Sequence, residues 1–139
     1  MNKNGFTLVE LLATIVIISV VMLIGTVSIT GVKKKINENT FKTKLEVVIN
    51  NAERWGQDNK ELLSTYQTKS ISDLINLKYI ETDDGTNLIN DTNGTSINNL
   101  SIKVYLQYNR VYACIEDSSA NKSLLEDNDK TKYKDYYCS

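Results

Sequence analysis

Glu10 is the residue near the N-terminus whose type and position most suggest chemistry. It is the only charged residue between Phe6 and Gly31, a stretch dominated by isoleucine, valine and leucine. A carboxylate in a membrane-spanning helix costs roughly 2.5 kcal/mol or more at the bilayer centre, so such residues are usually functional and paired. The alternative is that Glu10, about 6 Å along a helix from Phe6, reaches the lipid headgroups and has no further role.

The composition excludes several kinds of chemistry. The chain of 139 residues has no histidine, which removes the commonest general base and the commonest zinc ligand. We find neither a glycine-rich phosphate loop nor a pairing of serine with a base, so the sequence predicts a structural protein without a catalytic or metal site. The net charge of −1 shows no basic excess, so direct nucleic-acid binding is not indicated.

Two acidic segments, residues 91–95 and 126–129, faintly resemble calcium-binding loops. Neither completes the alternating pattern of acidic residues with a glycine and a distal glutamate that a calcium loop needs. Solvated turns are therefore the favoured interpretation, and no cofactor is expected. Calcium binding remains the alternative.

The apolar run from Phe6 to Gly31 is long enough to cross a membrane. A bilayer core of about 30 Å needs about 20 apolar residues in a helix, and this run exceeds that length. A secretory signal peptide is the alternative, but its apolar core is typically about 7–15 residues long. The length of the run, the carboxylate of Glu10 and the lack of a clear small-residue cleavage site favour a membrane-spanning helix.

The first residues of the chain combine into a specific motif. A short polar leader containing Lys3 ends at Gly5, Phe6 follows, and Glu10 is the fifth residue beyond this junction. Together with the apolar run, this pattern resembles the prepilin leader and processing site of type IV pilins and the related pseudopilins. The resemblance covers roughly residues 1–35 and is only architectural beyond them.

The resemblance implies a role for each matching residue. Gly5 would precede the bond cut by a prepilin peptidase, and Phe6 would become the new N-terminus, which is usually methylated in this family. Glu10 would neutralise the terminal ammonium of Phe6 in a neighbouring subunit, because a paired ammonium and carboxylate offset each other's desolvation. The implied partners are further copies of the chain, related pilins, the peptidase, the pilus assembly machinery and, before assembly, membrane lipid.

The implied location is the bacterial plasma membrane for a single-pass precursor and then an extracellular filament at the cell surface. Lys33, Lys34 and Lys35 directly follow the apolar run, and the positive-inside rule would place them in the cytoplasm. The family's orientation exports them instead. We adopt that orientation because the cleavage motif requires the leader on the cytoplasmic side.

Beyond the apolar run, the hydrophobic pattern becomes that of an amphipathic helix. Apolar residues fall along one broad stripe, and the chain has no proline, which predicts one continuous helix from Phe6 to about Asn59. A break at Gly31 is the alternative. A short helix is expected over residues 70–80, with Ser70 or Ser72 as its cap.

The rest of the chain reads as a small sheet with loops. A loop-rich zone with one short strand around residues 88–89 is followed by alternating apolar residues that predict a β-hairpin over 100–115, turning at Tyr108 and Asn109. The predicted fold class is α+β: a long N-terminal helix packed against a small antiparallel sheet. The predicted parts are a leader (1–5), a transmembrane and assembly half (6–31), an amphipathic stalk (32–60) and a globular head (61–139).

The two cysteines lie in the predicted head. In an exported domain, an isolated pair such as Cys114 and Cys138 usually forms a disulfide, which would fasten a polar C-terminal tail. Free thiols in a reducing compartment are the alternative. Three tyrosines of this tail could form an adhesive surface, but partly buried anchors are the favoured interpretation; they are Tyr133, Tyr136 and Tyr137.

These observations predict a major or minor pilin, the structural subunit of a type IV pilus-like filament. Within the same family, a type II secretion pseudopilin and a competence pilin for DNA uptake are alternatives. From other classes, the alternatives are a membrane-anchored binding module that never polymerises and a secreted enzyme, which would lack the apolar helix in its mature form.

Overall fold

The computed structural model describes residues 5–139, without the side chains of residues 25–28. The chain divides into two compact units, Met1–Ile36 and Asn37–Ser139. The first unit contains one structured element, the N-terminal part of helix α1 (Leu8–Asp58), and the second contains the remainder of α1 and all the other elements. The predicted division into leader, membrane half, stalk and head stays a prediction.

The expected long helix is confirmed, and α1 comprises 51 residues. Gly31 lies inside it, so the break considered at that residue does not occur. A glycine in a helix interior costs about 1 kcal/mol relative to alanine, which is too little to interrupt a helix supported by apolar residues on both sides. No proline is present anywhere in the chain to remove a backbone hydrogen bond.

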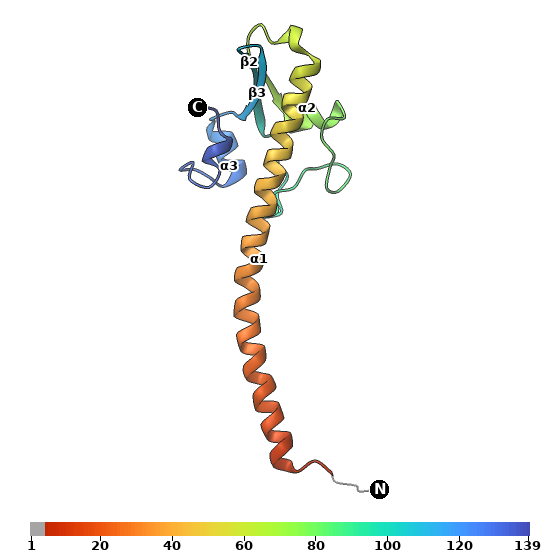
Figure 1. Cartoon of the computed structure of the whole chain (residues 1–139), viewed down its shortest axis with the longest axis vertical. Helices are drawn as coiled ribbons and strands as arrows, with labels where there is room; N and C mark the ends of the chain where they lie inside the picture. The colour runs from red at the N-terminus through yellow and green to blue at the C-terminus, as the bar shows by residue number, and fades with distance from the viewer. Residues whose placement is uncertain (1–4) are drawn as a thin grey trace. The chain divides into compact units, whose positions relative to one another are not determined.

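The second unit is built on a three-stranded antiparallel sheet that lies beside the C-terminal part of α1 (Figure 1). Strand β2 (Ser101–Gln107) is central, between β1 (Gln67–Ser70) and β3 (Arg110–Ile115). The predicted hairpin is confirmed: Tyr108 and Asn109 connect β2 to β3, both with positive φ, as a two-residue turn between twisted strands requires.

One stripe of α1 and the inner face of the sheet form the core of this unit. The spacing of three and four residues brings the buried side chains of α1 onto one side of the helix. These are Phe41, Leu45, Val48, Ala52 and Trp55. Gly56 marks the closest approach, because a Cβ atom there would lie 2.6 Å from methyl groups of both Val104 and Val111.

Helix α2 (Ile71–Asn76) confirms the short helix expected after the stalk, and it ends earlier than expected. Ser70 is its N-cap, and the Ser70 and Asp73 side chains each accept a hydrogen bond from the other residue's backbone N–H. The helix stops at Asn76 because Lys78 adopts a positive φ and the Tyr79 N–H bonds back to the Leu74 carbonyl.

Three features differ from the sequence-based expectations. Strand β1 and helix α3 (Ser119–Leu125) were not predicted, and the strand expected around residues 88–89 is reduced to a single bridge between Ile89 and Ser96. Short 3-10 helices, η1 (Lys60–Leu62) and η2 (Lys134–Tyr136), complete the fold. Strand β1 is four residues long and mainly polar, so its pairing with β2 is decided by neighbours rather than by its own hydrophobic pattern.

Candidate processing and assembly site

The junction between Gly5 and Phe6 lies just before the start of α1. Residues 5–7 are not helical, and the Phe6 side chain is 84% exposed. Among residues 5–139, no atom apart from the adjacent residue lies within 4 Å of the position that a Cβ would take at Gly5. The peptide bond predicted to be cut is therefore open on its glycine side. Lys3 and the rest of leader residues 1–4 lie outside the described residues.

Thr7 and Glu10 form a capping box at the start of α1. The Glu10 Oε2 atom accepts hydrogen bonds from the Thr7 backbone N–H at 3.0 Å and from the Thr7 hydroxyl at 3.1 Å. In return, the Thr7 Oγ1 atom accepts the Glu10 backbone N–H at 3.3 Å. The arrangement satisfies two backbone donors that a helix start otherwise leaves unpaired, and it holds a negative charge at the positive end of the helix dipole.

Thr7 is thus a helix-capping partner of Glu10 that the sequence motif did not single out. The signal was present, because a threonine followed three residues later by glutamate, ahead of an apolar run, is a capping-box pattern. Within one chain, the Glu10 carboxylate has a local partner in Thr7. Its pairing with the Phe6 ammonium of a neighbouring subunit joins two chains and stays a prediction.

The N-terminal part of α1 presents apolar side chains in every direction. Within the described residues, α1 is the one helix long and apolar enough to cross a membrane, and none of its apolar window is buried. Its large apolar side chains are half or more exposed. Examples are Leu12, Ile15, Val16, Ile18, Val21 and Leu23. A surface of this size needs a non-aqueous environment or another protein surface to cover it.

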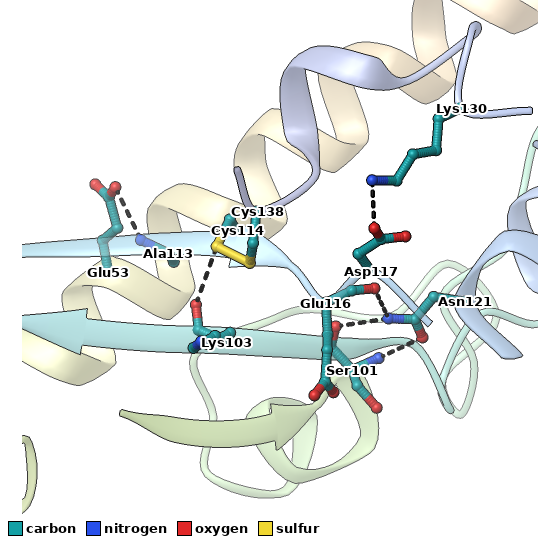
Figure 2. Close-up of a disulfide and its surroundings, with 10 residues drawn as sticks. All are labelled: Glu53, Ser101, Lys103, Ala113, Cys114, Glu116, Asp117, Asn121, Lys130 and Cys138. Carbon is teal, nitrogen blue, oxygen red and sulfur yellow. Dashed lines mark hydrogen bonds and ion pairs between the residues drawn. A yellow bond between two sulfur atoms is a disulfide. The ribbon is translucent and has the colours of Figure 1, made fainter. Parts of the chain in front are cut away.

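Cys114 and Cys138 form a disulfide, as expected, with Cα atoms 5.0 Å apart (Figure 2). The free-thiol alternative is thereby wrong. The bridge joins β3 to the last residues of the chain, where the Cys138 N–H also donates to the Ile115 carbonyl. The segment around Cys138 is therefore attached at the end of β3, where Ile115 forms a single parallel bridge with Tyr137.

The tail between the cysteines folds around polar anchors. The buried Asn121 amide accepts the Ser101 N–H at 3.0 Å and donates to the carbonyls of Ser101 and Glu116, at 3.0 and 2.7 Å (Figure 2). The Asp117 carboxylate forms ion pairs with Lys122 and Lys130. These bonds explain how the polar C-terminal tail contains helix α3.

Two tyrosines of this tail are buried, which confirms their interpretation as anchors. The Phe41 and Tyr133 rings meet edge to face, with their centroids 5.5 Å apart, and Tyr137 is 7% exposed. The Tyr136 hydroxyl donates to Glu46 of α1 at 3.0 Å. Burial and this carboxylate raise the pKa of Tyr136 to about 12.

Lys44 fastens the loop-rich zone to α1. Its Nζ atom lies 2.9 Å from the Asp83 carboxylate and 2.8 Å from that of Asp91, and it donates to the Ile89 carbonyl at 2.8 Å. Burial alone lowers the pKa of Lys44, but the hydrogen bonds to the two carboxylates outweigh it and leave that pKa raised. Burial raises the pKa of Asp83, and the bonds from Lys44 and the Ile89 N–H more than reverse this, so the pKa lies below its usual value.

The two segments considered for calcium use their carboxylates within the protein. Asp91 pairs with Lys44, and the buried Asp127 accepts the backbone N–H groups of Lys132 and Tyr133, both at 3.0 Å. Within residues 5–139, no group of three or more metal-ligating side chains is placed to hold a metal ion.

Comparison with known proteins locates the recognisable signature at the N-terminus. Residues 1–26 match the family model described as the prokaryotic N-terminal methylation motif. No curated protein and no solved structure matches the chain. The motif contains Gly5, Phe6 and Glu10, and it leads directly into the exposed apolar part of α1. The chain therefore carries the type IV pilin and pseudopilin signature on a pilin-like α+β fold.

Proposed function

We propose that the protein is a major or minor pilin, a structural subunit of a type IV pilus-like filament. The observation that carries the proposal is the methylation motif at residues 1–26, which includes the start of α1, a helix whose N-terminal part exposes its apolar side chains. The precursor is held in the membrane by this helix. After cleavage, copies of the helix pack against one another, so that the apolar surface is transferred from lipid to protein.

In the proposed assembly, the Glu10 carboxylate accepts the Phe6 ammonium of the next subunit. Both groups are costly in hydrocarbon, and pairing them offsets much of that cost while fixing the axial register between helices. The capping box supports this role, because Thr7 holds the Glu10 carboxylate close to the chain terminus that processing would create.

The first test is mass spectrometry of the mature N-terminus in the native host. We expect a chain that begins at Phe6 and carries one additional methyl group on its amine. A mature chain beginning at any other residue contradicts the proposal, and loss of the whole apolar helix identifies a secreted protein instead.

The second test separates a filament subunit from an anchored binding module. The Glu10→Ala variant should still be inserted and processed but should be strongly depleted from sheared fibres. Glu38→Ala is the matched control on the same helix, and it should assemble normally. Equal recovery of Glu10→Ala and the unchanged protein in fibres would contradict the assembly role of Glu10.

The disulfide favours a surface pilus among the related machines. It closes the C-terminal loop of an exported head, and such bonds persist in oxidising surroundings. A secretion pseudopilus and a competence pilus are distinguished from it by deletion of the gene: loss of surface fibres, loss of secreted proteins and loss of DNA uptake are three different phenotypes.

A further inference from the structure

Three consecutive lysines, Lys33, Lys34 and Lys35, follow the apolar run of α1, and we call them the lysine triplet. All three are helical and exposed, and no ion pair involves them among the described residues. We propose that the lysine triplet binds the headgroups of anionic phospholipids at the bilayer surface opposite the N-terminus. The inference rests on the proposed membrane-held precursor.

The length of α1 places the lysine triplet at the level of the headgroups. Leu8 and Lys33 are 25 residue steps apart in the sequence, which corresponds to about 38 Å along a helix and about 35 Å across a bilayer at the usual tilt of about 20°. A bilayer has a hydrocarbon core of about 30 Å and measures about 40–45 Å with its headgroups. With Leu8 at one boundary of the core, Lys33 therefore lies in the opposite headgroup layer, and Lys34 and Lys35 lie at the outer edge of that layer.

The angular spread of the three side chains favours lipid over a second protein surface. Successive residues of a helix are rotated by about 100°, so the lysine triplet covers about 200° of the circumference. A neighbouring helix contacts one side only and can pair with part of this arc. A layer of headgroups surrounds the helix and can contact all three ammonium groups at once.

The residues beside Lys33 provide a place for the upper part of an acyl chain. A shallow hollow of about 350 Å³ is lined by Ile29, Val32, Lys33 and Ile36. The apolar side chains of this hollow are more than half exposed. A lipid lying there would place its acyl chain against the apolar residues and its phosphate next to the Lys33 ammonium, which matches the amphipathic character of both partners.

The experiment uses the full-length precursor reconstituted into phosphatidylcholine vesicles that contain a spin-labelled lipid. Electron paramagnetic resonance measures how strongly labelled phosphatidylglycerol is immobilised at the protein relative to labelled phosphatidylcholine. One lysine at an anionic surface changes partitioning by about fivefold, so we expect a preference for phosphatidylglycerol of at least about that size. In 1 M salt, where charges are screened beyond about 3 Å, the preference should disappear.

The decisive variant is K33Q/K34Q/K35Q, which should bind the two lipids equally. The matched control K42Q/K60Q/K134Q removes the same charge from exposed lysines outside the triplet and should keep the preference. An unchanged preference in K33Q/K34Q/K35Q overturns the inference, and so does a wild-type protein without any preference. Release of the wild-type protein from vesicles by alkaline carbonate would instead contradict the membrane-spanning precursor itself.

Discussion

The two phenylalanines of the chain lie in opposite environments. Phe6, in the first compact unit, is 84% exposed, whereas Phe41, in the second, is fully buried. Both units contain a part of α1 that is rich in apolar residues, but only the second unit encloses these residues within the protein. The first region therefore needs a non-aqueous environment or another protein surface to cover its apolar side chains, and the second is stabilised by its own sheet.

The difference follows from how the apolar residues are distributed around α1. In the N-terminal region they occur at almost every position, so no single packed layer could cover them. Near Phe41, Leu45 and Val48 they occupy one stripe, and a three-stranded sheet is wide enough to bury it. A helix with apolar side chains on all sides is stable in a membrane or in a bundle of helices. A helix with one apolar stripe is stable when that stripe packs against a sheet in a globular domain.

The largest effect should come from truncating the two phenylalanines separately. We expect Phe41→Ala to lower the free energy of unfolding of the head by about 3–5 kcal/mol, because it opens a cavity and removes the edge contact with Tyr133. Phe6→Ala should leave that free energy unchanged. Denaturant unfolding of the full chain in detergent, followed by the fluorescence of the single Trp55, measures both. Equal losses in the two variants would contradict the division into two environments.

The disulfide should be the next largest contributor, and only to the head. Cys114 and Cys138 are separated by 24 positions, and closing a loop of that size stabilises a fold by about 3 kcal/mol through the entropy of the unfolded chain. The double variant Cys114→Ser/Cys138→Ser should show this loss in the same unfolding assay. Retention of the unmodified stability after reduction would show that the remaining anchors of the tail suffice without the bridge.

Glycine-to-alanine substitutions should change stability in opposite directions in the two regions. Gly56→Ala is expected to destabilise the head by about 1–3 kcal/mol, because the new methyl group collides with Val104 and Val111. Gly31→Ala meets nothing within 4 Å and should stabilise its helix by up to about 1 kcal/mol. Unfolding measures the first effect, and amide hydrogen exchange around residue 31 measures the second. If amide protons around residue 31 exchange faster in Gly31→Ala, the added methyl group must collide with a neighbouring molecule at this position.

The smallest effect should be a loss of head stability in acid. The folded-state pKa of Asp83 is lowered, so its contribution is present above the unfolded pKa of about 4 and is lost as pH falls through the lower folded value. Because Asp83 is partly exposed, we expect about 0.5–1 kcal/mol. Comparing Asp83→Asn with the unmodified chain at pH 7 and pH 3 measures this, and the difference between the two proteins should shrink at pH 3. If the difference in unfolding free energy between the two proteins is the same at pH 3 and pH 7, the contribution of Asp83 comes from packing and not from its charge.

Sequence patterns were sufficient to predict those segments in which one type of residue, or one spacing of apolar residues, dominates. The apolar run, the Gly5–Phe6 junction and Glu10 were recognisable without a structure, because transfer to a membrane depends on composition and processing depends on a short linear motif. The β2–β3 hairpin was also predictable, since period-two alternation and a two-residue turn specify it locally. Local rules of this kind act before any tertiary contact forms.

Tertiary structure decided the elements whose local signals are weak or polar. Strand β1 exists because β2 offers it hydrogen-bonding partners, and helix α3 is stabilised because Asn121 bonds to two backbone groups of the distant Ser101 and to the nearby Glu116 carbonyl. The ion pairs by which Lys44 attaches the loop-rich zone to α1 likewise depend on Asp83 and Asp91, which lie far from it in the sequence.

The sequence by itself determined which part of the chain needs a non-aqueous environment, since the free energy of hydrophobic transfer depends only on composition. How the polar remainder closes into a head was decided by long-range pairing, since each buried polar group must find its partner in three dimensions.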